Sequence, residues 1–202
     1  MINTIKHFDL SFKIIIVGDS FVGKTNILST YTKNTFDENK NPTIFDFHNK
    51  SIEIENKIIN FQIWDTAGQE RYKSIIYGFY KNAKGAFIVY DITDLKSFLS
   101  VDYRFVDLKN KTDAEIILIG NKCDLTSKRK ISYQEGKNKA SFYNSNFFEV
   151  SAKTKYNIRN VFNALTTSIY EKYENNLDLE NYEKVPFGHK KEFKEKINIR
   201  CC

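Results

Sequence analysis

The sequence has few of the residues that bend or cross-link a chain. Of its 202 residues only 2 are proline, 8 are glycine and 3 are cysteine. Three cysteines cannot build the disulfide framework of a small secreted domain, which favours a reducing compartment. No apolar run approaches the roughly 18–20 residues that a membrane-spanning helix needs. The first ten residues lack the apolar stretch of a signal peptide, so we expect the chain in the cytosol unless something attaches it to a membrane.

A strong excess of one charge is also absent. Lys plus Arg number 31 against 25 Asp plus Glu, which gives a formal charge of +6. A dedicated nucleic-acid binder concentrates basic charge more than this, so we expect no nucleic-acid partner. Hydrophobic residues make up 41% of the chain, enough for one packed core, and the length suits a single domain with a remainder.

Short β-branched runs alternate with longer amphipathic segments along most of the chain. This alternation predicts parallel strands joined by crossover helices, and therefore an α/β fold. The predicted strands are 12–17, 45–54, 58–64, 86–90, 115–120 and 147–150. The predicted helices are 23–31, 71–81, 95–109, 133–143 and 158–173. Residues 51–55 alternate between polar and apolar side chains, which predicts a hairpin or an edge strand.

The composition changes beyond about residue 173. Hydrophobic residues become isolated, residues 171–183 are acidic and residues 184–200 are basic. We therefore expect a short N-terminal extension (1–10), a folded domain (11–173) and a flexible C-terminal tail (174–202).

A glycine-rich motif follows the first predicted strand and opens the first predicted helix. Residues 18–25, GDSFVGKT, match the pattern G-x-x-x-x-G-K-[ST] in full. Such a loop directs backbone N–H groups at phosphate oxygens, while its lysine adds a positive charge and its hydroxyl can bind Mg²⁺. The candidate phosphate-binding residues are Asp19, Ser20, Phe21, Val22, Gly23, Lys24 and Thr25.

Three more motifs lie at the ends of predicted strands. WDTAG (64–68) follows the third strand, NKCD (121–124) the fifth and SAK (151–153) the sixth. Because open α/β sheets bind ligands at the carboxyl ends of their strands, all four motifs should meet at one edge. Asp65 could hold a magnesium-bound water there, and Gly68 could offer a bare backbone N–H to a terminal phosphate.

Together these motifs resemble those of the Rab family of small GTPases, over about residues 12–170. Segments that resemble typical Rab stretches are FQIW (61–64), DTAGQERY (65–72), FYKNA (79–83) and IVYDIT (88–93). The resemblance implies a three-layer P-loop NTPase fold, with a six-stranded, mostly parallel sheet and helices on both faces. It also implies a guanine-nucleotide switch that hydrolyses GTP to GDP and phosphate, slowly without an activating protein.

The resemblance assigns the choice of base to a few residues. Asp124 would accept hydrogen bonds from the guanine ring N–H and amino group, a pair that adenine cannot offer. Asn121 and Lys122 would brace the base pocket, and Phe36 would pack against the guanine. The backbone groups that would contact the guanine oxygen belong to Ser151, Ala152 and Lys153.

For hydrolysis, the resemblance gives Gln69 the task of orienting the attacking water. Thr25 and Thr43 would bind Mg²⁺ through their hydroxyls, and Asp65 would act through water. Gly68 would sense the γ-phosphate, so loss of that phosphate would release Thr43 and Gly68 together. No arginine is evident in the chain at a position that could assist hydrolysis, so we expect dependence on an activating protein.

The tail and the family together imply a membrane location. Cys201 and Cys202 resemble the double-cysteine ending of Rab proteins, which implies paired geranylgeranylation. Two lipid chains bind a membrane stably, and the basic residues between 190 and 200 would add attraction to an anionic leaflet. We expect a protein that cycles between cytosol and the cytoplasmic face of an intracellular membrane and regulates vesicle trafficking. Its implied partners are an exchange factor, a GTPase-activating protein, a GDP-dissociation inhibitor and effectors, and nothing requires a dimer.

Two departures from the family pattern bear on function. Phe21 stands where most relatives have glycine or another small residue, and a positive φ there would be unfavourable for phenylalanine. We hypothesise that Phe21 alters hydrolysis or the choice of partner. The segment TIFDF (43–47) is one residue shorter than the typical TIGVDF, which could shift the register of the strand that follows.

Two other functions stay open. One is a GTP/GDP-binding membrane scaffold that does not hydrolyse, which would arise if Phe21 and the shortened segment spoil the cycle. Intact Gln69, Thr43 and Asp65 weigh against it. The other is an ATP-using P-loop enzyme, and Asp124 weighs against that.

Overall fold

A six-stranded sheet forms the centre of the first of two units, residues 1–165 and 166–202, into which the chain divides. A computed structural model describes residues 8–38, 45–66, 78 and 80–184, with the backbone alone given for 45, 66 and 177–184. The strands are β1 (Leu10–Gly18), β2 (Phe45–Ile54), β3 (Lys57–Thr66), β4 (Ala83–Asp91), β5 (Glu115–Asn121) and β6 (Asn146–Glu149).

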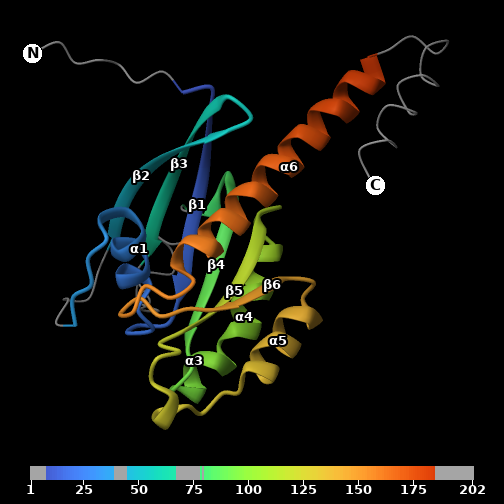
Figure 1. Ribbon diagram of the computed structural model, residues 1–202. Coiled ribbons are helices and arrows are strands. Elements are labelled where there is room, and N and C mark those ends of the chain that lie inside the picture. Colours follow the sequence, from blue (N-terminus) through green and yellow to red (C-terminus); the bar gives the residue numbers. More distant parts are fainter. Residues whose placement is uncertain (1–7, 39–44, 67–77, 79, 185–202) are drawn as a thin grey trace, which may run out of the picture. The chain divides into compact units, whose positions relative to one another are not determined.

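The strands lie in the order β2–β3–β1–β4–β5–β6 (Figure 1). β2 is antiparallel to β3, and all other neighbours are parallel. The apolar run of β1, from Ile14 to Val17, is buried throughout, as expected of a central strand covered on both faces. The predicted α/β fold with a mostly parallel sheet is confirmed.

Helices cover both faces of this sheet. They are α1 (Lys24–Lys33), α3 (Leu95–Leu99), α4 (Val101–Lys109), α5 (Tyr133–Phe142) and α6 (Ile158–Lys184). On one face Phe87 of β4 packs edge-on against Phe162 of α6, which stacks on Tyr31 of α1. On the other face Ile88 of β4 belongs to an apolar cluster with Phe105 of α4. Adjacent residues of one strand thus point into two cores, and the fold has three layers.

The helical boundaries differ from the predicted ones in two places. The predicted helix 95–109 is two helices that meet at Ser100, whose hydroxyl donates to the Ser97 carbonyl (3.0 Å) instead of pointing into solvent. The last helix does not end at residue 173 but continues to Lys184, so residues 174–184, expected in a flexible tail, are helical. Neither proline nor glycine interrupts this segment.

Some expectations lie outside the described residues. Of the predicted helix 71–81, the structure describes little more than helical positions at Gly78 and Tyr80. The division into extension, domain and tail remains a prediction. None of the described helices is long and apolar enough to cross a membrane.

The register of β2 is fixed by the turn that precedes β3. Glu55 and Asn56 both have positive φ (49° and 62°), the backbone of a two-residue hairpin turn that matches the twist of the strands. From this turn the pairing runs without a break from Ile54 opposite Lys57 to Phe45 opposite Thr66. The missing residue therefore does not interrupt the register within β2.

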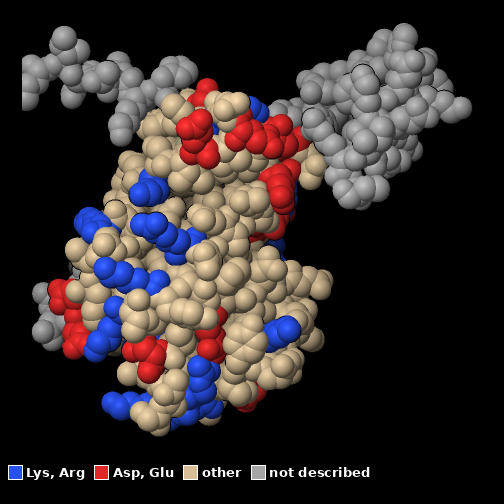
Figure 2. Space-filling view, in the orientation of Figure 1, with Lys and Arg blue, Asp and Glu red and all other residues tan. Residues whose placement is uncertain are grey.

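Charged side chains of both signs lie on the face that Figure 2 draws, with wide uncharged areas between them. This distribution agrees with the mild excess of basic charge in the sequence.

Candidate nucleotide-binding site

The loop between β1 and α1 depends on two glycines. A Cβ on Gly18 would lie 2.3 Å from the Val89 carbonyl oxygen, and one on Gly23 would lie 2.3 Å from Asn121 Nδ2. Gly23 also has a φ of 95°, a conformation that side chains disfavour. The loop can therefore press against β4 and β5 only because both positions lack a side chain, and α1 begins directly after it.

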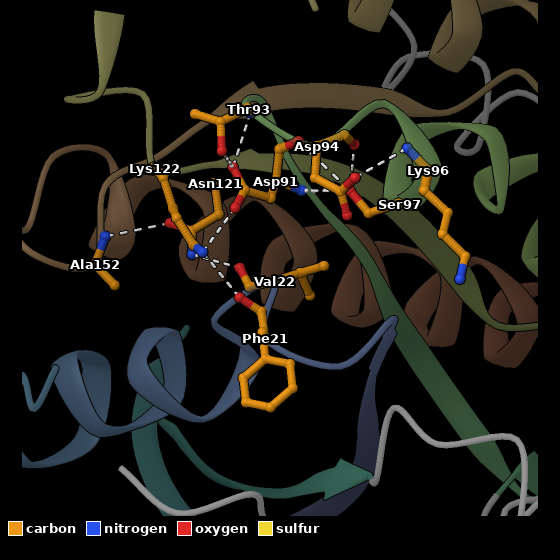
Figure 3. Close-up of polar contacts among 10 residues, drawn as sticks. All are labelled: Phe21, Val22, Asp91, Thr93, Asp94, Lys96, Ser97, Asn121, Lys122 and Ala152. Atoms are coloured by element: carbon orange, nitrogen blue, oxygen red, sulfur yellow. Dashed lines mark hydrogen bonds and ion pairs between the residues drawn. The ribbon is translucent and has the colours of Figure 1, made fainter. Parts of the chain in front are cut away.

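Phe21 has the positive φ that is unfavourable for a phenylalanine. Its φ is 64°, and its side chain is 76% exposed. Figure 3 shows its ring pointing away from Asn121 and Lys122, while its carbonyl accepts a hydrogen bond from Lys122 Nζ (2.9 Å). The left-handed conformation of a residue with a Cβ is unfavourable by about 1–2 kcal/mol.

Lys24 is held inside the loop. Its ammonium donates to the carbonyls of Gly18 (3.0 Å) and Asp19 (2.7 Å), and its side chain is buried. Burial lowers the pKa of Lys24 to about 8, while the nearby Asp65 carboxylate opposes that shift. A bound phosphate would favour the charged form, because an adjacent anion raises the pKa of an ammonium. The Lys24 ammonium is thus positioned to bind an anion in the loop.

Thr25 and Asp65 form a pair of hard oxygen donors. The Thr25 hydroxyl donates to the Asp65 carboxylate, which is fully buried at the end of β3. Within the described ranges no group of three or more His, Cys, Asp or Glu side chains could hold a metal. Mg²⁺ bound together with phosphates usually takes one or two protein oxygens, and this pair fits such an ion. Thr43, Gly68 and Gln69 lie outside the described residues.

Asn121 joins the loop after β1 to the loop after β6. Its Nδ2 donates to the Val22 carbonyl (2.8 Å), and its Oδ1 accepts the backbone N–H of Ala152 (3.3 Å). Lys122, in a left-handed conformation, pairs with Asp91 at the end of β4 (2.6 Å) while it also bonds to Phe21. Figure 3 shows these contacts converging from separate strands.

The carboxylate of Asp124 is fixed by a buried serine. Ser151 Oγ donates to Asp124 Oδ1 (2.6 Å) and accepts the backbone N–H of Thr154 (3.0 Å). Asp124 itself remains partly exposed. A carboxylate held in this way at the edge of the sheet can accept hydrogen bonds from a ligand.

Phe36 lies half-buried in the loop after α1, and the two residues that follow it contact other segments. The Asp37 carbonyl accepts from Asn26 Nδ2 (2.8 Å), and Glu38 pairs with Lys153 (2.5 Å). The structure therefore brings the segment that carries Phe36 to the 151–153 loop.

One contact at the site has no signal in the sequence. Arg104, on α4 and largely buried, pairs with the Asp19 carboxylate (2.5 Å). The contact depends on how α4 packs on the sheet, which no local pattern reveals. It ties the start of the phosphate loop to a helix on the far side from α1.

Fold and site together define the class: a P-loop NTPase with its motifs gathered at the carboxyl edge of the sheet. The sequence model of the Ras family matches residues 13–171. The Ras-related protein RABA1h of Arabidopsis thaliana is 43% identical over 81% of this chain and 76% of its own length. Rab11B of Nicotiana tabacum is 41% identical (81% and 77%), and RABA1b of Arabidopsis thaliana is 37% identical (96% and 95%).

The chain therefore belongs to the Ras family of small GTPases, within which it is a Rab protein. Guanine-nucleotide binding and a GTPase switch follow from this membership.

The backbone at residue 21 gives a prediction about stability. Phe21→Gly should be more stable than Phe21→Ala by about 1 kcal/mol, because only glycine relieves the left-handed strain, although its greater freedom when unfolded offsets part of the gain. The measurement is urea unfolding at a fixed GDP concentration.

Ser20 provides the matched control for that comparison, because its φ is not positive. There the order should reverse, with Ser20→Ala more stable than Ser20→Gly. An alanine at position 21 as stable as the glycine would contradict the account of the loop.

Proposed function

We propose that the chain is a Rab-like switch that binds GTP and GDP with Mg²⁺, hydrolyses GTP slowly and regulates vesicle trafficking from a membrane surface. The observation that carries the proposal is the position of Asn121, which bonds both to the phosphate loop and to the loop that would hold the base. In a nucleotide complex this one side chain would link the loop at the phosphates to the loop at the base.

Base selectivity would reside in Asp124. Its carboxylate would accept the ring N–H and amino group of guanine, and the Ser151 hydroxyl would keep it oriented. Asn121 and Lys122 would brace the pocket, and the backbone of residues 151–153 would contact the guanine oxygen. Phe36 would pack on the base, in a segment held by the Glu38–Lys153 pair.

The phosphates would lie against the backbone of residues 19–25 and the ammonium of Lys24. Mg²⁺, when bound, would neutralise charge on the phosphate oxygens. Thr25 and Thr43 would hold it directly, and Asp65 would act through water. The contact between Thr25 and Asp65 supports this assignment.

Hydrolysis would be slow because the chain supplies positioning but little extra positive charge. Gln69 would orient the water, and Gly68 would sense the γ-phosphate. Arg104, which lies beside the loop, is engaged by Asp19. An activating protein would therefore set the rate of GTP hydrolysis in the cell. The further partners would be an exchange factor, a GDP-dissociation inhibitor and effectors.

Single-turnover hydrolysis tests the enzyme. We expect the GTP-loaded full chain to release phosphate at roughly 10⁻⁴–10⁻³ per second, and Gln69→Leu to be at least about tenfold slower with unchanged GTP affinity. No phosphate release from the native chain would favour the non-hydrolysing scaffold instead. The strained backbone and the exposed side chain of Phe21 are the observations that keep the scaffold alternative open. Equal turnover and activator response in Phe21→Gly would refute a role for Phe21.

Membrane attachment would come from lipids on Cys201 and Cys202. We expect Cys201→Ser/Cys202→Ser to move the protein from the membrane fraction of cells to the cytosol. Two lipid chains anchor a protein stably, and the double variant would carry none. Cys123→Ser is the matched control and should stay on membranes, because Cys123 lies just after β5 in the folded part of the chain and is not one of the two cysteines that would carry lipid. A double variant that remains with the membranes would rule out this anchor.

A further inference from the structure

An arginine of α4 reaches the loop between β1 and α1. Arg104 Nη2 lies 2.5 Å from Asp19 Oδ1, and the two side chains are only 15% and 25% exposed. Arg104 Nε is buried and has no hydrogen-bond partner among the residues that the structure describes. A guanidinium that is mostly removed from water and only partly hydrogen-bonded is unfavourable, so the negative charge beside it is what stabilises Arg104 at this position.

Each member of this pair depends on the other for its compensating charge. Asp102 and Asp107, the acidic residues of α4 itself, pair with lysines instead. Within the described part of the chain, Asp19 is the one carboxylate that pairs with Arg104, and Arg104 is the one cation that pairs with the Asp19 side chain. Loss of either partner would therefore leave the other charge uncompensated and partly buried.

The pair lies beside the lysine that is proposed to bind the phosphates. The Asp19 carbonyl accepts a hydrogen bond from Lys24 Nζ (2.7 Å). Burial lowers the pKa of Lys24 to about 8, and the Asp65 carboxylate is the largest influence in the opposite direction. The Arg104 guanidinium lowers the pKa of Lys24 further and the Asp19 carboxylate raises it, so both charges of the pair act at this ammonium.

A free carboxylate at the start of a loop that receives phosphates would repel them, and more strongly where water is scarce. We propose that Arg104 is a positioning residue for the nucleotide and acts through Asp19: it cancels the charge of that carboxylate and holds it toward α4, so that the loop retains the phosphates of GDP and GTP. The inference rests on the proposed binding of the phosphates along residues 19–25.

A purely mechanical role of the pair is the alternative. If the pair only braced the loop against α4, loss of Arg104 and loss of the Asp19 charge would loosen the loop alike, and loss of both would be no better than loss of one. If Arg104 compensates Asp19, the two losses differ in sign. Removing the cation leaves a repulsive charge near the phosphates, whereas removing the anion leaves an attractive one.

The release of GDP tests the proposal. The full chain is loaded with GDP that carries a fluorescent group on its ribose, and release is followed after addition of excess GTP in the presence of Mg²⁺. Arg104→Met keeps an unbranched side chain without the charge, and it should release GDP about tenfold faster than the native chain. Asp19→Asn should release GDP no faster than the native chain. The double variant Asp19→Asn/Arg104→Met should return to within about twofold of the native rate.

Lys139→Met is the matched control, because it also removes the cation of a partly buried ion pair with α4, that of Lys139 with Asp102 (2.6 Å). This pair lies outside the proposed nucleotide site, so the variant should leave the rate of GDP release unchanged even if it lowers the free energy of unfolding. Arg104→Lys keeps the positive charge and should stay closer to the native rate than Arg104→Met does.

Two results would overturn the proposal while GDP binding stays intact. One is a native rate of release in Arg104→Met. The other is the pattern of a mechanical brace, in which Asp19→Asn is as fast as Arg104→Met and the double variant is no slower. If Arg104→Met does not fold, Asp19→Asn and the double variant decide, because accelerated release by either contradicts charge compensation. A native chain that binds no GDP would contradict the proposed function itself, and this inference with it.

Discussion

The nucleotide site depends on how closely the loop after β1 approaches β5. Asn121 reaches that loop through the Val22 carbonyl, and the approach is possible because Gly23 has no side chain to meet the amide. The same amide accepts the N–H of Ala152 and so fixes the loop after β6. Three segments that are far apart in the chain are thereby held together by one side chain.

The phosphate loop is braced from several sides, which explains how it holds a strained phenylalanine. Lys122 bonds to the Phe21 carbonyl and is itself anchored by Asp91, while Arg104 holds Asp19. Strained backbone persists where the surroundings over-determine it. The bracing also links the loop to α4, because Arg104 belongs to that helix.

Much of this architecture could be predicted from the sequence because its determinants are local. Buried β-branched runs marked the strands, and each motif followed a strand directly, so parallel pairing alone was enough to bring the motifs together. For Phe21 the sequence indicated only that a positive φ would be unfavourable, and the structure gives it a φ of 64°. The turn at Glu55 and Asn56, which lacks the usual glycine, then fixed a register that the sequence had left open.

What could not be predicted depends on tertiary packing. The Arg104–Asp19 pair joins residues 85 positions apart, and no sequence pattern around either residue predicts the contact. The break at Ser100 and the continuation of α6 beyond residue 173 reflect a side chain to backbone bond and the absence of a breaker, which periodicity does not capture.

The central claim is that the site selects guanine nucleotides. The most direct measurement is the nucleotide content of the full chain, purified with Mg²⁺ but without added nucleotide, denatured and separated by ion-exchange chromatography. The account predicts GDP or GTP in stoichiometric amount, lost in Asp124→Ala. An adenine nucleotide in the native chain, or no nucleotide at all, would contradict it.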